Sequence, residues 1–140
     1  MTRLVLFDID GTLILTGGAG MKAFAEAFAE EFDLPHATEA MDFAGRTDRG
    51  LACQVFRAND IPPTEENFQR FTKAYTQRLA KHLPADNTQP LPGVVELLDA
   101  VEAMTAPPTL GLLTGNLPLG AELKLTHYHL WHRFEFGAFG

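Results

Sequence analysis

The sequence predicts an α/β protein with a mainly parallel sheet and an all-helical insert. Three apolar segments have the pattern of buried strands, at residues 3–7, 109–113 and 134–139. Helical patterns separate these strands, and strands that alternate with helices form parallel sheets with right-handed crossovers. The insert, residues 17–89, is about half of the chain and has no strand pattern of its own. We therefore expect it to pack as a small separate helical bundle.

The helices are expected from apolar residues that recur every three to four positions and from start signals at their ends. Thr47 and Thr64 are suited to cap the helices that follow them, and Pro118 suits the first turn of the last helix. The expected helices cover residues 20–33, 48–58, 65–83, 93–104 and 118–127.

Apolar stripes on these helices indicate which residues face the interior. In the fourth helix the residues expected to face inward are Val94, Leu97, Leu98 and Val101. The first and third helices carry mainly aromatic stripes, which we interpret as core or interface: Met21, Phe24, Phe28, Phe32, Phe68, Phe71, Tyr75 and Leu79.

The composition is that of an ordinary globular domain, and it argues against some classes of partner. The 140 residues carry a net charge of −7, which disfavours nucleic acids and anionic membrane surfaces. A single cysteine, Cys53, excludes an internal disulfide. No window approaches the roughly 18 apolar residues of a membrane-spanning helix, and the N-terminal apolar run is too short for a signal peptide. We expect a cytoplasmic protein.

The segment F-D-I-D-G-T-L places two carboxylates, Asp8 and Asp10, at the end of the first strand. Side chains two residues apart in an extended chain point to the same side. A divalent cation relieves the repulsion between such carboxylates, and Mg²⁺ prefers carboxylate and phosphate oxygens. A carboxylate can also attack a phosphoryl group. The alternative is an acidic turn, since Asp-Gly is a common turn dipeptide.

The segment L-L-T-G-N ends the second strand with Thr114, Gly115 and Asn116. A hydroxyl, a glycine that lets the backbone approach a ligand, and an amide can hold phosphoryl oxygens next to a helix N-terminus. In parallel sheets, ligands bind beyond the C-terminal ends of the strands, where Asp8 and Asp10 also lie. An ordinary turn is the alternative interpretation of these three residues.

These segments resemble the first two motifs of the haloacid dehalogenase superfamily of phosphatases and phosphotransferases. The resemblance extends to the order of elements and implies the phosphoglycolate phosphatase-like branch. It implies a Rossmann-like core of residues 1–16 and 90–140, and a helical cap of residues 17–89 that closes over the active site. The third motif of the family is a lysine, for which Lys124 is the candidate; a solvent-facing helical lysine is the alternative.

The resemblance also implies roles for the site residues. Asp8 would be the nucleophile, and Asp10 the acid and then the base. Mg²⁺ would bind the Asp8 carboxylate and the Asp10 backbone carbonyl, while Thr114 and Lys124 spread the charge of the transferring group. Because dehalogenases of the superfamily lack an aspartate at the second position, Asp10 favours phosphate chemistry. Residues expected to bind a small phosphorylated metabolite are Gly11, Thr12, Gly45, Arg46, Gly115 and Asn116.

The chain departs from the family pattern at the fourth motif. Acidic residues after a fourth strand complete the Mg²⁺ shell in relatives, and no such residues follow Gly140. We expect the sheet to be incomplete on its C-terminal side, with an exposed edge at the first strand that allows a dimer. We also expect a fragment or a short gene product with weak or absent turnover. The alternatives to a phosphatase are a phosphotransferase or mutase of the same fold and a catalytically incompetent binding module.

Overall fold

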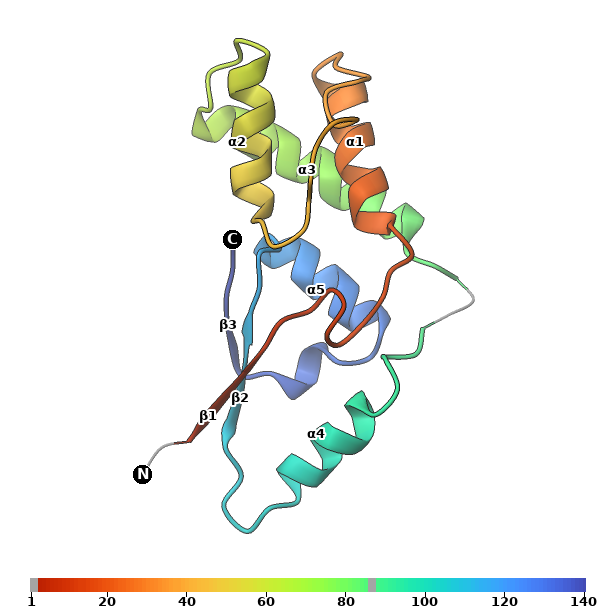
Figure 1. The fold of residues 1–140 in the computed structure, drawn as a ribbon, viewed down its shortest axis with the longest axis vertical. Helices are drawn as coiled ribbons and strands as arrows, with labels where there is room; N and C mark the ends of the chain where they lie inside the picture. Colours follow the sequence, from red (N-terminus) through yellow and green to blue (C-terminus); the bar gives the residue numbers. More distant parts are fainter. Residues whose placement is uncertain (1–2, 86–87) are drawn as a thin grey trace.

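The computed structural model describes residues 3–85 and 88–140 (Figure 1). The first two residues of the predicted core and residues 86–87 of the predicted cap therefore lie outside the description. The elements are, in chain order, β1 (Leu4–Phe7), α1 (Ala19–Glu31), α2 (Asp48–Ala58), α3 (Glu65–His82), α4 (Val94–Glu102), β2 (Thr109–Leu113), α5 (Pro118–His127), the 3₁₀ turn η1 (Trp131–Arg133) and β3 (Phe136–Ala138). None of the helices in these ranges is long and apolar enough to cross a membrane.

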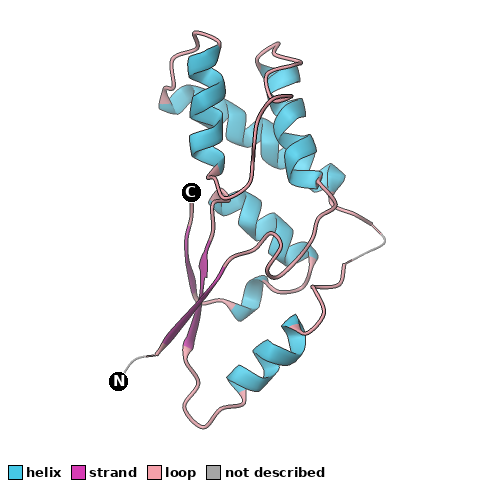
Figure 2. Cartoon of the chain, in the orientation of Figure 1, coloured by secondary structure: helices cyan, strands magenta, loops and turns pink. Residues whose placement is uncertain are grey.

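The three strands form one parallel sheet in the order β1-β2-β3 (Figure 2). Leu4 lies opposite Thr109, and Gly111 lies opposite Phe136. The helical insert begins after β1, and the chain returns to the sheet and its flanking helices with α4. The predicted α/β class, with its parallel sheet and inserted helices, is therefore confirmed, and β1 forms one edge of a short sheet.

The sheet has one covered face and one open face. Helices α4 and α5 lie to one side of it (Figure 1). Because successive strand residues alternate between faces, every second residue points away from these helices. The buried residues on the covered side include Ile9, Leu13, Ile14, Leu98, Leu110, Leu112, Leu125 and Tyr128. The large apolar side chains of the strands that are exposed, by 44% to 56%, are Leu4, Leu6, Leu113 and Phe136.

One predicted core position on α4 is wrong. Val94 and Leu98 are buried and Val101 is half-buried, as expected, but Leu97 is 50% exposed. Only one flank of α4 packs on the interior, and Leu97 lies on the other flank, where no described element covers it. The apolar stripe is therefore wider than the contact it makes.

The insert has a core of aromatic side chains, separate from the one under the sheet. Helices α1, α2 and α3 each contribute to it (Figure 1). The ring centroids of Phe24 and Phe71 are 4.8 Å apart, and those of Phe28 and Phe56 are 5.4 Å apart. Buried aromatic pairs at such distances stabilise a core beyond their area alone. We propose, as the sequence predicted, that residues 17–89 form a cap domain.

The predicted helix starts are present in the structure. The side-chain oxygen of Thr47 accepts the N–H of Gly50 at 3.1 Å at the start of α2. That of Thr64 accepts the N–H of Asn67 at 3.3 Å at the start of α3. Pro118 occupies the first turn of α5. Each polar cap satisfies a backbone donor that the helix itself cannot satisfy, which fixes where the helix begins.

The open sheet face and the edge at β1 predict that the chain associates with itself. We expect Leu6→Lys to reduce the mass observed at high protein concentration, because a charge at this position opposes pairing of apolar surfaces. Sedimentation velocity over a concentration series measures this, with Leu119→Lys, an exposed leucine on α5, as the control. A wild-type chain that stays monomeric at every concentration would contradict the prediction.

Candidate active site

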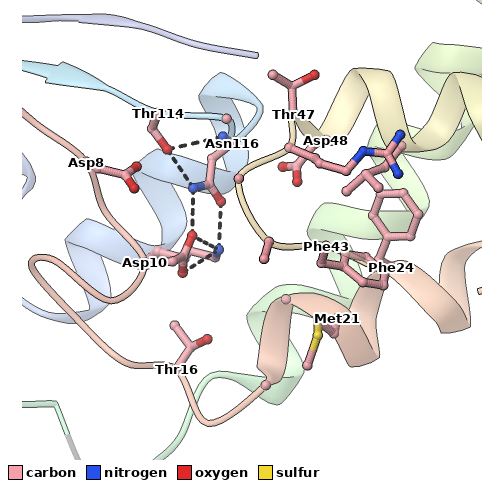
Figure 3. A pocket seen from close by; sticks show the side chains of 18 of the residues that line it. Asp8, Asp10, Thr16, Met21, Phe24, Phe43, Thr47, Asp48, Thr114 and Asn116 are labelled. Atoms are coloured by element: carbon pink, nitrogen blue, oxygen red, sulfur yellow. Dashed lines mark hydrogen bonds and ion pairs between the residues drawn. The ribbon is translucent and has the colours of Figure 1, made fainter. Parts of the chain in front are cut away.

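A cavity of about 1040 Å³ lies where the C-terminal ends of the strands face the helical insert. Figure 3 shows Asp8, Asp10, Thr114 and Asn116 on one side of it, with Phe24, Phe43 and Asp48 from the insert across from them. Its lining contains these predicted site residues: Asp8, Asp10, Gly45, Arg46, Thr114, Gly115, Asn116 and Lys124. Residues more than 100 positions apart in the sequence thus meet in one site.

Gly11 and Thr12, which were also predicted to bind substrate, lie outside this cavity lining. They form the turn that follows Asp10. Gly11 has φ of +76°, a conformation that glycine adopts readily, and its N–H donates to the Ile14 carbonyl at 2.9 Å. The N–H of Thr12 donates to the Ile9 carbonyl at 3.2 Å. Their observed contribution is to bend the chain behind the two aspartates.

Asp8 and Asp10 flank Ile9, which is fully buried. Strand β1 ends at Phe7, but the alternation continues through these positions, so both aspartates are exposed while Ile9 enters the core. The carboxylate of Asp8 accepts no hydrogen bond from the described residues and makes no ion pair with them. It is thus an unpaired anion at the wall of the cavity, available to a cation or an electrophile.

Lys124 is a buried cation that joins the two motifs. Its side chain is 5% exposed, and Nζ donates to both carboxylate oxygens of Asp10 at 2.9 Å. It also donates to Oδ1 of Asn116 at 2.7 Å. An ammonium has three donors, and all three are used here. The alternative of a solvent-facing lysine does not fit this position.

Asn116 and Thr114 complete the network (Figure 3). The amide nitrogen of Asn116 donates to Oδ2 of Asp10 and to Oγ1 of Thr114, both at 2.8 Å. Its backbone N–H also donates to Thr114 Oγ1, at 3.2 Å. Because the threonine oxygen accepts two bonds, its own proton is left to donate, and no described residue accepts it. The hydroxyl is therefore a donor for a ligand oxygen in the cavity.

Asp48, at the start of α2, binds the loop that carries these residues. Its carboxylate accepts the N–H of Leu117 at 2.9 Å, and its own N–H donates to the Gly115 carbonyl at 2.7 Å. A Cβ on Gly115 would lie 2.3 Å from the carbonyl oxygen of Arg46, so only glycine permits this approach. The insert is thereby held against the N-terminus of α5.

Burial raises the pKa of the Asp48 carboxyl above its usual range. The hydrogen bond from Leu117 and the charge of Lys124 act in the opposite direction, while the charge of Asp10 raises the pKa further. Removal from water is the largest of these effects. The carboxylate is therefore held in a position that favours its neutral form.

Asp48 and Met21 are among the cavity residues that were not identified as site residues from the sequence. Asp48 follows a helix cap, where an acidic residue is common without any further role. Met21 was predicted to be core because of its spacing to Phe24, but it is 53% exposed and lines the cavity. Helical spacing does not distinguish a side chain in a core from one on the wall of a cavity. The segment G-R-T-D around Gly45 was the available signal for Asp48.

The site can hold Mg²⁺ through two protein oxygens. Asp8 presents its unpaired carboxylate, and the backbone carbonyl of Asp10 accepts no hydrogen bond from the described residues. Mg²⁺ commonly binds through one or two carboxylates together with water and substrate phosphate. No group of three or more His, Cys, Asp or Glu side chains suited to a metal occurs within residues 3–85 and 88–140. The described residues therefore fit a cation that takes most of its ligands from water and substrate.

A sequence model of the family described as haloacid dehalogenase-like hydrolase matches residues 5–138. The chain belongs to this family. A comparison with curated proteins gives no match.

Solved structures of family members share the fold at low sequence identity. CbbY from Rhodobacter sphaeroides, solved with phosphate, aligns with 100% of this chain at 19% identity and a TM-score of 0.69. A predicted phosphoglycolate phosphatase from Haemophilus somnus aligns with 99% of it at 23% identity and a TM-score of 0.66. The chain covers 64% and 63% of these two proteins. It therefore spans less than two thirds of their length.

The hydrogen bond between Asp48 and Leu117 predicts that two substitutions of Asp48 lower the stability of the chain by different amounts. Asp48→Ala removes the acceptor, and we expect it to lower the free energy of unfolding by about 1 kcal/mol. Asp48→Asn keeps an oxygen that can accept the Leu117 N–H and removes the buried charge. It should therefore lower the free energy of unfolding by less than Asp48→Ala does.

The raised pKa of Asp48 also predicts how the stability of the chain depends on pH. The native state binds a proton at Asp48 more readily than the unfolded chain does, because the pKa of this carboxyl is raised above its ordinary value of 3.8 in the native state. The contribution of Asp48 to the free energy of unfolding therefore rises as the pH falls toward 3.8. The stability of wild type relative to Asp48→Asn should therefore increase as the pH falls below neutral. Denaturant unfolding of both proteins over a pH series measures this, and a constant difference would contradict it.

Proposed function

We propose that this chain carries the active site of a Mg²⁺-dependent phosphatase that hydrolyses small phosphate monoesters through an aspartyl-phosphate on Asp8. The observation that carries the proposal is the unpaired Asp8 carboxylate in a cavity where Lys124 and Thr114 supply a charge and a free hydroxyl donor. Membership of the haloacid dehalogenase-like hydrolase family supports the class of reaction.

The first half of the reaction transfers the phosphoryl group to the protein. An oxygen of Asp8 attacks phosphorus, the ester bond to the alcohol oxygen breaks, and Asp10 gives that oxygen a proton. In the present arrangement Asp10 accepts hydrogen bonds from Lys124. Arrival of a phosphoryl group therefore has to draw the ammonium toward its own oxygens, which frees Asp10 to carry a proton.

The second half regenerates Asp8. Asp10 takes a proton from water, the water oxygen attacks phosphorus, and the bond between phosphorus and Asp8 breaks to release inorganic phosphate. Thr114 donates to one phosphoryl oxygen throughout, and its position is held by the two N–H groups of Asn116. The Asp8 carboxylate and the Asp10 backbone carbonyl would hold Mg²⁺, which would supply positive charge to offset the charge of the phosphoryl oxygens.

Arg46 is the residue that we propose reads the far end of the substrate. It lies in the cavity lining, and it forms no ion pair with the described residues. Lys124, the other basic residue of the lining, is fully occupied. An unpaired guanidinium favours a substrate with a carboxylate or a second phosphate.

Two other functions use the same geometry. Transfer of the phosphoryl group to a sugar hydroxyl instead of water gives a phosphotransferase or mutase, and analysis of the product distinguishes it. A binding module without turnover is favoured by the lack of a third acidic metal ligand in the part of the chain that the structure describes. It would bind phosphate and leave it unchanged.

Hydrolysis of an aryl phosphate by the wild-type chain, with Mg²⁺ or with EDTA, tests the proposal. We expect all Mg²⁺-dependent turnover to disappear in Asp8→Asn, because the amide cannot act as the nucleophile. Asp60→Asn is the matched control, since Asp60 has φ of +54°, which asparagine tolerates, and lies outside the cavity lining. Turnover that survives in Asp8→Asn would contradict the mechanism. A folded wild-type chain that binds phosphate without turnover would favour the binding module.

A further inference from the structure

Tyr75 is a buried tyrosine whose hydroxyl has no partner in the described part of the chain. The residue is 1% exposed, yet it lines the cavity that also contains Asp8. Its ring lies on the aromatic core of the insert, stacked on Phe71 with centroids 5.7 Å apart and edge-on to Phe24 at 6.1 Å. Buried tyrosine hydroxyls usually find a hydrogen-bond partner. Among the described residues the only fully buried side-chain polar atom without a partner is Nε of Arg78, so the Tyr75 oxygen is open to the cavity.

The hydroxyl lies close to the catalytic network. A Cβ placed on Gly20 would be 3.3 Å from Nζ of Lys124 and 3.8 Å from the hydroxyl oxygen of Tyr75, so the two groups are neighbours across this glycine. A Cβ on Gly120 would be 3.2 Å from the tyrosine ring and 3.5 Å from its oxygen. Gly20 belongs to α1 and Gly120 to α5, so the Tyr75 hydroxyl lies where these two helices approach α3.

The hydroxyl stays protonated at physiological pH. Burial raises the pKa of Tyr75 well above its ordinary value of 10.0, and the nearby charges of Asp48 and Asp10 raise it further. A neutral phenol can donate one hydrogen bond and accept others. The group is therefore a polar contact for an uncharged oxygen, distinct from the cation at Arg46.

We propose that the Tyr75 hydroxyl binds the alcohol part of the substrate and selects phosphate monoesters that carry a second hydroxyl oxygen near the ester bond. In the proposed site, Lys124 and Thr114 hold the phosphoryl end of the substrate. The Tyr75 hydroxyl lies next to Lys124 on the side of the insert, so it would contact the alcohol part of the substrate, beyond the ester oxygen. Because Tyr75 belongs to α3, the insert itself supplies this contact. The inference rests on the proposed function, since it assumes that the phosphoryl group binds at Asp8.

Two esters of nearly equal size and equal charge test this selection. Hydroxyethyl phosphate presents an oxygen where propyl phosphate presents a methyl group, and neither carries a second anionic group for Arg46. Their dissociation constants are measured by titration calorimetry with Mg²⁺, in the full chain with Asp8→Asn, so that turnover does not consume them. The readout is the ratio of the dissociation constants of propyl phosphate and hydroxyethyl phosphate. This ratio is compared between the Asp8→Asn parent and the same chain with Tyr75→Phe added.

We expect the preference for hydroxyethyl phosphate to fall about three- to tenfold in Tyr75→Phe, as for loss of one neutral hydrogen bond, with propyl phosphate unaffected. Tyr128→Phe is the control, because that hydroxyl donates to the Leu15 carbonyl at 2.6 Å and Tyr128 does not line the cavity. It should leave the ratio unchanged. The tyrosine ring carbon bonded to oxygen gives a second readout, since its chemical shift should move with hydroxyethyl phosphate more than with propyl phosphate.

An unchanged ratio and an unchanged Tyr75 shift, with both esters still bound, would overturn this inference and leave the proposed phosphate site in place. A wild-type chain that does not bind inorganic phosphate in the presence of Mg²⁺ would overturn the proposed function, and this inference with it.

Discussion

The buried ammonium of Lys124 is the interaction on which the site depends. It donates to Asp10 and to Asn116, which follow β1 and β2, and it reaches them from α5. Removing a cation from water is costly unless every donor is used, and here all three are. The ion pair therefore aligns the ends of two strands with one helix and leaves Asp8 as the unpaired carboxylate. In the proposed function, Lys124 would therefore both stabilise the fold and neutralise the phosphoryl group.

The helical insert contributes to the site through close backbone approach. Gly115 admits the carbonyl of Arg46, and Asp48 bonds to the loop on both sides of Asn116. The loop that carries Gly115 and Asn116 is therefore also the surface on which the insert rests. Tyr75 reaches α5 from the same side across Gly120. The substrate recognition that we propose for the insert and the alignment of the core would therefore depend on one contact region.

The sequence predicted the elements well because each had a local cause: alternation for the strands, and the caps at Thr47 and Thr64 for two helices. It also placed Lys124 as a candidate through the resemblance to the family. It could not show that Leu97 would be exposed, because that depends on what covers one flank of α4. The aromatic stripe predicts Tyr75 as core, and the residue is indeed 1% exposed, but it also lines the cavity. Which atoms of a buried residue meet a ligand is decided by tertiary packing.

The affinity for inorganic phosphate in the presence of Mg²⁺ tests the central role of Lys124 most directly. The account predicts that Lys124→Met weakens binding about ten- to a hundredfold, the effect of losing a hydrogen bond from a charged donor. Lys22→Met, which removes an exposed lysine of α1 outside the cavity lining, should leave the affinity unchanged. Thermal unfolding shows whether each variant remains folded. A folded Lys124→Met chain that binds phosphate as tightly as wild type would contradict the account.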